Sequence, residues 1–136
     1  MRQLILGWVF ACLSASFAFA DEPANPAMRG VITSQIEAFR LDDFGLAFGY
    51  ASPNIQNYFQ SPERFEAMVR NGYPMVHRPA EVRFLELREI AGAFWQKMLI
   101  RDQAGFVHIL DYQMVKGDDG WMINAVQLLQ QSETGV

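Results

Sequence analysis

The sequence has little cysteine and histidine, and it lacks the short motifs of common enzyme sites. Its one cysteine lies near the N-terminus, so the rest of the chain forms no disulfide and depends on its core alone. The two histidines, His77 and His108, stand in no H-x-x-x-H or H-E-x-x-H pattern, which leaves no recognisable metal site. A G-x-S-x-G motif, a phosphate-binding loop and a dinucleotide fingerprint are also missing. We therefore expect no catalytic motif, no metal and no cofactor.

Positive charge is scarce as well. The 136 residues include 11 basic and 15 acidic ones, and the charges are interspersed instead of forming a basic stripe. Binding to a phosphate backbone needs such a stripe, so we expect no nucleic acid as a partner. The acidic balance also argues against anionic lipid headgroups. The length predicts a single domain.

The first 20 residues predict a cleaved secretory signal. Arg2 supplies the positive start, residues 4–15 are apolar, and Ala18-Phe19-Ala20 forms a small-x-small cleavage site. The apolar run is shorter than the roughly 20 residues of a membrane span, so a stable anchor is the weaker alternative. Cys12 would suit a lipoprotein signal, but Phe10 is bulky for that motif. The prediction is a periplasmic or secreted protein.

Helical spacing dominates the first half of the remaining chain. Residues 21–27 hold two prolines and small polar residues, which is typical of a flexible linker. The spacing then predicts a helix over residues 28–41, with Ile32, Ile36 and Phe39 on one face. Asp42-Asp43 invites a catalytic or metal interpretation, but an N-cap followed by a first-turn acid is the simpler one, since Phe44, Ala47, Phe48 and Ala51 form one face of a following helix.

Two Ser-Pro pairs predict two short helices in tandem. In Ser52-Pro53 and Ser61-Pro62 the serine suits the N-cap and the proline suits the first turn. Gly72 is expected to end the second helix as a left-handed C-cap, and Pro74 to prevent its continuation. Residues 73–79 are expected to be irregular and to form a polar rim around a pocket mouth.

In the second half of the chain the apolar residues recur at every second position. Strands are expected over residues 81–90, 93–101, 106–115 and 121–129, joined by short glycine-containing turns, with residues 130–136 as a polar tail. This alternation shifts by one residue near Phe84-Leu85, which predicts a β-bulge. Helices followed by hairpins predict an α+β domain over residues 28–129, with helices packed on a curved four-stranded antiparallel sheet.

The third predicted strand has two largely apolar faces. Phe106, His108, Leu110, Tyr112 and Met114 share one face, and the alternate residues share the other. Helices cover only one face, so either a homodimer through the sheet or a terminal segment is expected over the second. His108 beside Tyr112 suits acid–base chemistry, but both residues also suit a filled core.

Candidate ligand-binding residues lie in the tandem helices, the irregular segment and the third strand. They are Tyr58, Tyr73, His77, Arg78, His108 and Tyr112. Asp111 points to the other face of the strand from His108 and Tyr112, so these three residues form no triad. Arg78 also suits pairing with a helix C-terminus or a surface acid.

The segment from Ser52 to Pro79 follows the pattern S-P-x-I-x-x-x-F-x-x-P-x-x-F-x-x-M-V-x-x-G-Y-P-x-V-x-R-P. Together with Asp119-Gly120-Trp121-Met122-Ile123 it resembles a family of small exported bacterial proteins known only as a domain of unknown function. The resemblance covers roughly residues 32–129. His77 stands where an aromatic residue is usual in that pattern. The order of elements in turn resembles the cone-shaped superfamily of nuclear transport factor 2 and ketosteroid isomerase.

That resemblance implies a curved sheet that wraps a long helix and leaves a cavity. Enzymes of the superfamily use a carboxylate base and acidic hydrogen-bond donors, and no motif of theirs is recognisable here. We therefore expect a non-catalytic module that binds a small apolar ligand or a protein partner. The alternative is a small cavity enzyme of the ketosteroid isomerase type that uses His108, Tyr112 or His77 as a His/Tyr acid–base pair. A purely structural domain is a third possibility.

Overall fold

The computed structural model describes residues 22–131, which fold into five helices and four strands. The expected signal over residues 1–20 and the last five residues of the expected tail lie outside the described residues. The elements follow one another as α1 (Pro26–Arg40), α2 (Phe44–Gly49), α3 (Pro53–Phe59), α4 (Pro62–Gly72), α5 (Pro74–His77), β1 (Pro79–Ile90), β2 (Ala93–Asp102), β3 (Val107–Gly117) and β4 (Gly120–Gln131).

Side-chain caps set where four of the helices begin. The carboxylate of Asp43 accepts from the N–H of Leu46 at 3.0 Å, and the hydroxyls of Ser52 and Ser61 accept from the third residue of their helices. The caps at Ser52 and Ser61 were predicted. The Asp42-Asp43 pair was expected to supply a cap followed by a first-turn acid, but Asp43 itself is the cap and the first turn of α2 has no acidic residue. Asn25 caps α1 in the same way, so that helix begins at Pro26, inside the expected linker.

Four local expectations are wrong. The expected linker is in part ordered, because Glu22 also bridges to Leu87 at the edge of β1. Gly72 has no left-handed φ and is the last residue of α4, so the chain instead turns at Tyr73. Pro74 then opens the short helix α5 within the segment expected to be irregular, because proline suits the first turn of a helix as well as it ends one. β4 continues to Gln131, beyond the expected start of the tail.

The four strands form one antiparallel sheet in the order β1-β2-β3-β4. The predicted bulge is confirmed, since the register of β1 against β2 shifts between Phe84 and Leu87. The amide nitrogen of Gln96 donates to the carbonyl of Leu85 at 3.0 Å, which satisfies a carbonyl that the bulge takes out of the ladder. The β1–β2 turn has positive φ at Ala91 and Gly92, as a two-residue hairpin turn requires.

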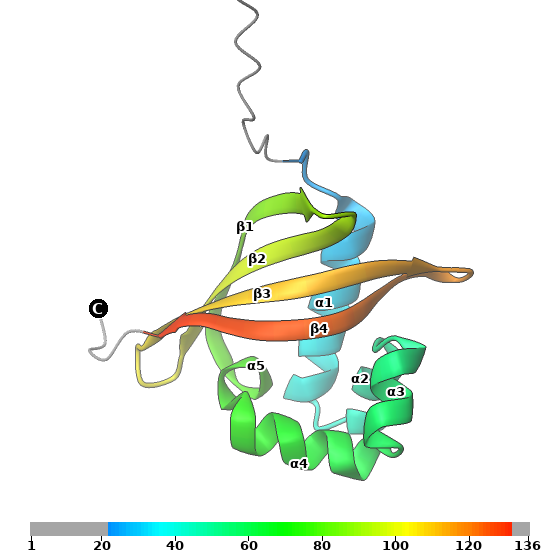
Figure 1. Ribbon diagram of the computed structural model, residues 1–136. Helices are drawn as coiled ribbons and strands as arrows, with labels where there is room; N and C mark the ends of the chain where they lie inside the picture. The colour runs from blue at the N-terminus through cyan, green and yellow to red at the C-terminus, as the bar shows by residue number, and fades with distance from the viewer. Residues whose placement is uncertain (1–21, 132–136) are drawn as a thin grey trace, which may run out of the picture.

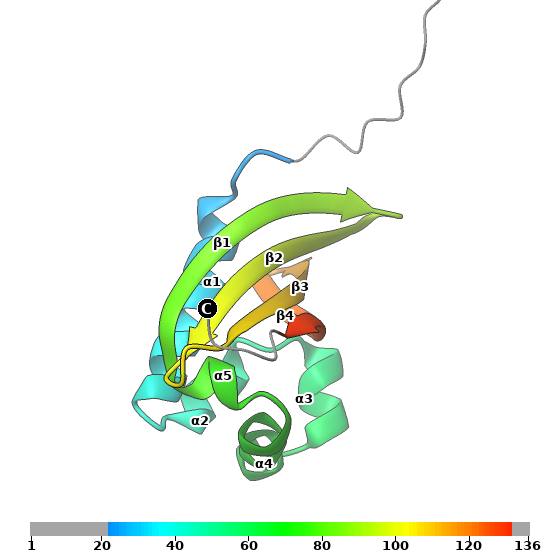
Figure 2. The ribbon, with the colours of Figure 1, turned by 90° about the vertical axis from the view of Figure 1, so that its left-hand side faces the viewer.

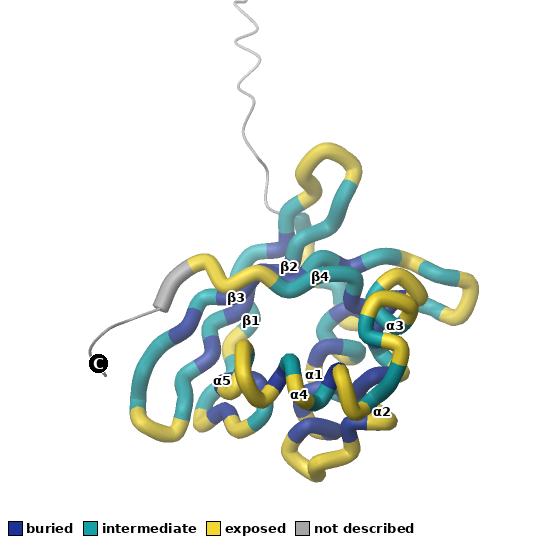
Figure 3. Tube along the Cα trace, turned by 60° about the horizontal axis from the view of Figure 1, so that its bottom comes forward, coloured by how far each residue is buried: buried dark blue, intermediate teal, exposed yellow. Residues whose placement is uncertain are grey.

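The sheet is curved, and α1 lies along its hollow side (Figures 1 and 2). We call this side the concave face; its buried residues include Met98, Ile100, Leu110, Tyr112 and Met114, and they pack against Ile32, Ile36 and Phe39 of α1. α2 to α5 close the lower end of the hollow, and their outward sides are exposed (Figure 3). The predicted α+β fold, with helices on one side of an antiparallel sheet, is confirmed.

Candidate ligand-binding site

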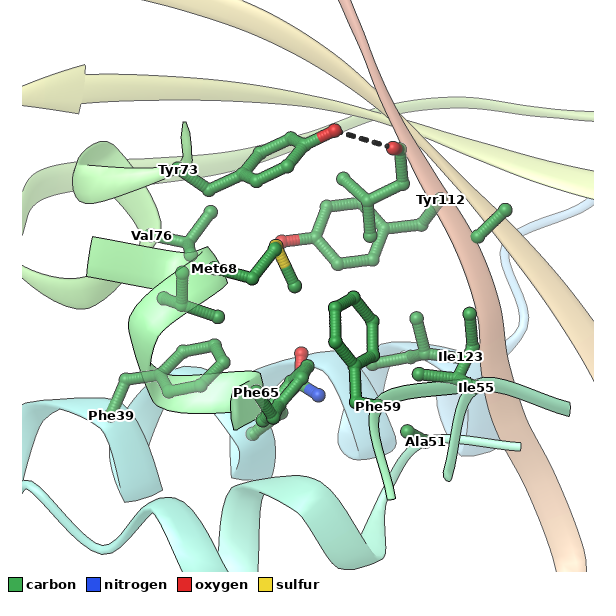
Figure 4. Close-up of a pocket in the computed structure, with 14 residues that line it drawn as sticks. Phe39, Ala51, Ile55, Phe59, Phe65, Met68, Tyr73, Val76, Tyr112 and Ile123 are labelled. Atoms are coloured by element: carbon green, nitrogen blue, oxygen red, sulfur yellow. Dashed lines mark hydrogen bonds between the residues drawn. The ribbon is translucent and has the colours of Figure 1, made fainter. Parts of the chain in front are cut away.

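An apolar pocket of about 330 Å³ lies between the helices and the concave face. Helices α1, α3, α4 and α5 and strands β3 and β4 all contribute to its lining (Figure 4). The lining residues are mostly aliphatic or aromatic and comprise Gln35, Phe39, Ala51, Ile55, Phe59, Phe65, Met68, Val69, Tyr73, Val76, Tyr112, Ile123, Ala125 and Val126. We call this space the apolar pocket. Its size and lining are those of small-molecule sites.

The aromatic side of the pocket is built around Phe65 of α4. Its ring centroid lies 6.0 Å from that of Phe39, 5.2 Å from Phe48 and 5.8 Å from Phe59, in tilted or edge-on arrangements. Such contacts hold rings apart at fixed angles instead of collapsing them into a single stack. The cluster therefore fixes one wall of the pocket.

The opposite wall is tied to the sheet edge by the segment that leads into α3. The N–H of Ser52 donates to the carbonyl of Ile123 at 2.8 Å, so this segment runs beside β4 as a short parallel bridge. The Ser52 hydroxyl donates to the side-chain oxygen of Asn124 at 2.7 Å. α3 itself contains no buried residue, but Ile55 and Phe59 line the pocket from it.

Two tyrosines supply polar groups to the apolar pocket. The Tyr73 hydroxyl donates to the carbonyl of Val126 at 3.0 Å, which ties α4 to β4 (Figure 4). Tyr112 is 1% exposed, and its hydroxyl points across the pocket towards Met68. Burial, and secondarily the nearby Tyr73, raise the pKa of Tyr112 above its ordinary value of 10.0. Tyr112 is therefore a neutral hydrogen-bond donor at physiological pH.

His108 lies on the same strand as Tyr112 but faces a different cavity. This second cavity, about 410 Å³, is lined by Gly72, Pro74, Met75, Arg78, Asp102, Gln103, Ala104, His108 and Leu128. The ring nitrogen Nε2 of His108 donates to the carboxylate of Asp102 at 2.8 Å. Nδ1 is buried and has no hydrogen-bond partner in the described part of the chain.

Asp102 holds His108 from the turn between β2 and β3. Burial acts to raise the pKa of Asp102, but hydrogen bonds from His108 and from the N–H groups of Phe106 and Ala104 outweigh it and lower the pKa below 3.8. The carboxylate therefore stays ionised and orients the imidazole. Sequence reasoning missed this pair, although the hairpin brings Asp102 close to His108 at the end of the β2–β3 ladder.

His77 and Arg78 meet Asp42 on the outside of the helical layer. His77 Nε2 and Arg78 Nη2 lie 2.7 and 2.9 Å from the same Asp42 oxygen. The His77 hydrogen bond, with further help from Arg78 and against partial burial, lowers the pKa of Asp42. Arg78 also donates to the carbonyl of Phe39 at 2.9 Å, so the predicted pairing with a helix C-terminus and an acid is confirmed. Asp42, by contrast, is no helix cap.

The six candidate residues therefore separate into distinct places. Tyr73 and Tyr112 line the apolar pocket, whereas Arg78 and His108 line the second cavity. His77 packs against Phe44 and does not line either cavity, and Tyr58 is 78% exposed on α3. The most important lining residue that was missed is Gln35, whose position on the apolar stripe of α1 suggested only a neighbour of the core.

The described part of the chain offers no group of three or more His, Cys, Asp or Glu that could hold a metal ion. None of the described helices is long and apolar enough to span a membrane. Asp111 pairs with Arg88 on the face away from His108 and Tyr112, as the alternation along the strand predicted.

Comparison with protein families gives one match. The family model described as Domain of unknown function (DUF4864) matches residues 21–136. The chain belongs to this family. Membership confirms the expectation, based on Ser52 to Pro79, of a family defined only as a domain of unknown function. No curated protein and no solved structure matches the chain.

Proposed function

We propose that this DUF4864 protein is a non-catalytic binding module for a small apolar ligand, which it holds in the apolar pocket. The pocket itself carries the proposal. It combines a volume of about 330 Å³ with an almost wholly apolar lining and with one buried hydroxyl aimed inward. Such a combination is the usual form of a small-molecule site, in which apolar walls supply affinity and a few polar groups supply orientation.

Acid–base catalysis finds less support in the same geometry. Among the residues that the structure describes, tyrosine is the only titratable type in the lining of the apolar pocket. The raised pKa of Tyr112 makes it a donor and a poor base. His108 and Tyr112 face different cavities, so they do not form the His/Tyr pair that an enzyme of this layout would use. Binding therefore accounts for the pocket better than a reaction does.

A neutral fluorescent probe tests the proposal. N-phenyl-naphthylamine becomes bright in an apolar site, and we expect it to bind the wild-type chain at a single site. Met68→Trp places a larger ring into the pocket and should weaken binding about tenfold or more, because the added volume competes with the probe. Leu46→Trp is the matched control, since Leu46 is exposed on α2 and does not line the pocket. Equal effects of the two substitutions, or no binding by the wild type, would refute the proposal.

We further propose that the fold belongs to the cone-shaped superfamily of nuclear transport factor 2 and ketosteroid isomerase. The long helix α1 in the hollow of a curved sheet supports this proposal (Figure 2).

We also propose that residues 1–20 direct export. The order of Arg2, the apolar run and Ala18-Phe19-Ala20 supports this proposal. N-terminal sequencing of the exported product tests the export proposal: a mature chain beginning at Asp21 is expected, and a retained leader would contradict it.

A homodimer through the sheet also remains a proposal. The face away from the helices carries half-exposed Leu99, Ile109 and Val115, which a second copy would cover. Sedimentation equilibrium should then show a dimer in the wild type and a monomer after Ile109→Glu. A wild-type monomer at high concentration would reject it.

A further inference from the structure

We infer that the apolar pocket selects an uncharged ligand that carries a hydrogen-bond acceptor for the Tyr112 hydroxyl and a hydrogen-bond donor for the side-chain oxygen of Gln35. This inference rests on the proposed function and specifies the ligand class. It follows from two polar groups of the pocket lining that make no hydrogen bond with the described residues, one on β3 and one on α1.

The first of these groups is the hydroxyl of Tyr112. The residue is 1% exposed, and none of the described residues makes a hydrogen bond with its hydroxyl. The hydroxyl is not one of the fully buried atoms that lack a partner, so it is open to the space of the pocket, where a ligand acceptor would replace water beside it. Tyr73 does not compete for that acceptor, because its own O–H is already donated to Val126. The pocket therefore offers one free donor.

The second group is the amide of Gln35, which is 4% exposed. Its Nε2 donates to the carbonyl of Ala47 at 3.1 Å, and a carbonyl accepts only from the nitrogen, so the orientation of the amide is fixed. The oxygen Oε1 consequently faces away from Ala47, and it makes no hydrogen bond within residues 22–131. Oε1 is therefore an acceptor that can bind a donor of the ligand.

Charge excludes acidic and basic ligands. Within residues 22–131, the lining of the apolar pocket holds no Arg, Lys or His that would neutralise a carboxylate, and no Asp or Glu that would neutralise an amine. Moving an unpaired charge into such a lining is strongly unfavourable. A fatty acid or an amine is therefore a poor candidate, whereas a neutral ring compound with a carbonyl and an N–H or O–H suits the site.

Four bicyclic compounds of nearly equal size separate the contributions of the two hydrogen bonds to binding. Indane is apolar, indanone adds an acceptor, indole adds a donor, and oxindole carries both. Titration calorimetry of the wild type and Tyr112→Phe should show that the substitution weakens indanone and oxindole by about three- to tenfold and leaves indane and indole unchanged. Gln35→Met should weaken indole and oxindole by a similar factor and leave indanone unchanged, which also shows that its pocket is intact.

The outcomes distinguish this inference from the proposed function. If the wild type binds the four compounds but Tyr112→Phe affects all of them equally, the selection by hydrogen bonding is wrong and the apolar binding module stands. If carboxylate analogues such as indane-carboxylate bind as tightly as indanone, the exclusion of charge is wrong. If the wild type binds none of the compounds, the binding module itself is wrong.

Discussion

The two faces of the sheet differ in how their side chains are stabilised. On the concave face, side chains such as Met98, Leu110 and Met114 are fully buried against helices. On the convex face, which we define as the side away from the helices, charged side chains pair along and across the strands. Arg88 and Asp111 form a two-pronged pair with both distances 2.7 Å, and Lys97 lies 2.7 Å from Glu86.

The difference shows that strand alternation alone does not decide which face is a core. β3 places Ile109 and Val115 on the convex face and Leu110 and Met114 on the concave one, with similar apolar character. Helix cover makes only the second set fully buried. The apolar residues of the convex face are only partly buried, since no described helix covers them.

The largest expected effect comes from the concave side. Phe39→Ala should lower the free energy of unfolding by about 3–5 kcal/mol, because Phe39 is 1% exposed and its ring contacts Phe44 and Phe65. Urea unfolding measures this loss. Leu41→Ala, at a position 76% exposed, is the control and should change stability by less than about 0.5 kcal/mol. Similar losses for the two variants would show that the helical layer does not form the core.

The next effect tests the convex face. Asp111→Ala should cost about 2–3 kcal/mol, less than for a fully buried pair, because it leaves the Arg88 guanidinium largely buried at 16% exposure without its carboxylate. The double variant Arg88→Met with Asp111→Leu should return to near wild-type stability, since two apolar side chains need no partner. Urea unfolding of the wild type, Arg88→Met, Asp111→Leu and the double variant completes a double-mutant cycle for the pair. A double variant as unstable as the single one would show that the pair is more than a local compensation of charge.

Much of the concave architecture was predictable from local signals. The caps at Ser52 and Ser61, the bulge near Phe84 and the four strands depend on nearest neighbours, and all were predicted. The Asp42-Asp43 pair was correctly expected to cap α2, but the cap is its second residue and not its first. The prediction at Gly72 was wrong because a glycine at the end of a helix suggests a left-handed C-cap. Here the chain turns at Tyr73 instead, and Pro74 begins the next helix, α5.

The composition of the candidate site was less predictable, because it depends on which side chains meet across the fold. Tyr73 and Tyr112 were chosen for their polar tips and do line the apolar pocket. Tyr58 was expected on the apolar face of its helix, but it is 78% exposed, whereas Ile55 and Phe59 of the same helix line the pocket. Gln35 could not be recognised, since only the position of the Ala47 carbonyl shows which end of its amide is free. Pairings over long sequence distances carry no local signal.

A smaller effect is expected where the two faces are linked around the edge of β4. The Ser52 hydroxyl caps α3 and binds Asn124, whose amide donates to Gln113 on the convex face at 2.8 Å. Ser52→Ala should therefore cost about 2 kcal/mol, at the upper end for a cap, because it also removes the donor to the partly buried side-chain oxygen of Asn124. Ser61→Ala removes only a cap near the surface and should cost about 1 kcal/mol. Equal losses in urea unfolding would show that the link to Asn124 adds nothing.

The smallest expected effect is on the stability of the protein at low pH. It compares Asp102 with the ion-paired carboxylates of the convex face. The folded-state pKa of Asp102 lies below its ordinary value of 3.8, so the folded protein binds fewer protons at this site than the unfolded chain does. The resulting stabilisation is complete above pH 3.8 and is lost as the pH falls through the folded-state pKa. Asp102→Asn, which keeps an acceptor for His108, should reduce the loss of stability between about pH 5 and pH 2.5. Because Glu81 and Glu86 on the convex face also have lowered pKa values, most of the acid sensitivity should survive in this variant. Urea midpoints at both pH values measure the difference, and an unchanged difference would mean that the His108 pair contributes nothing to acid stability.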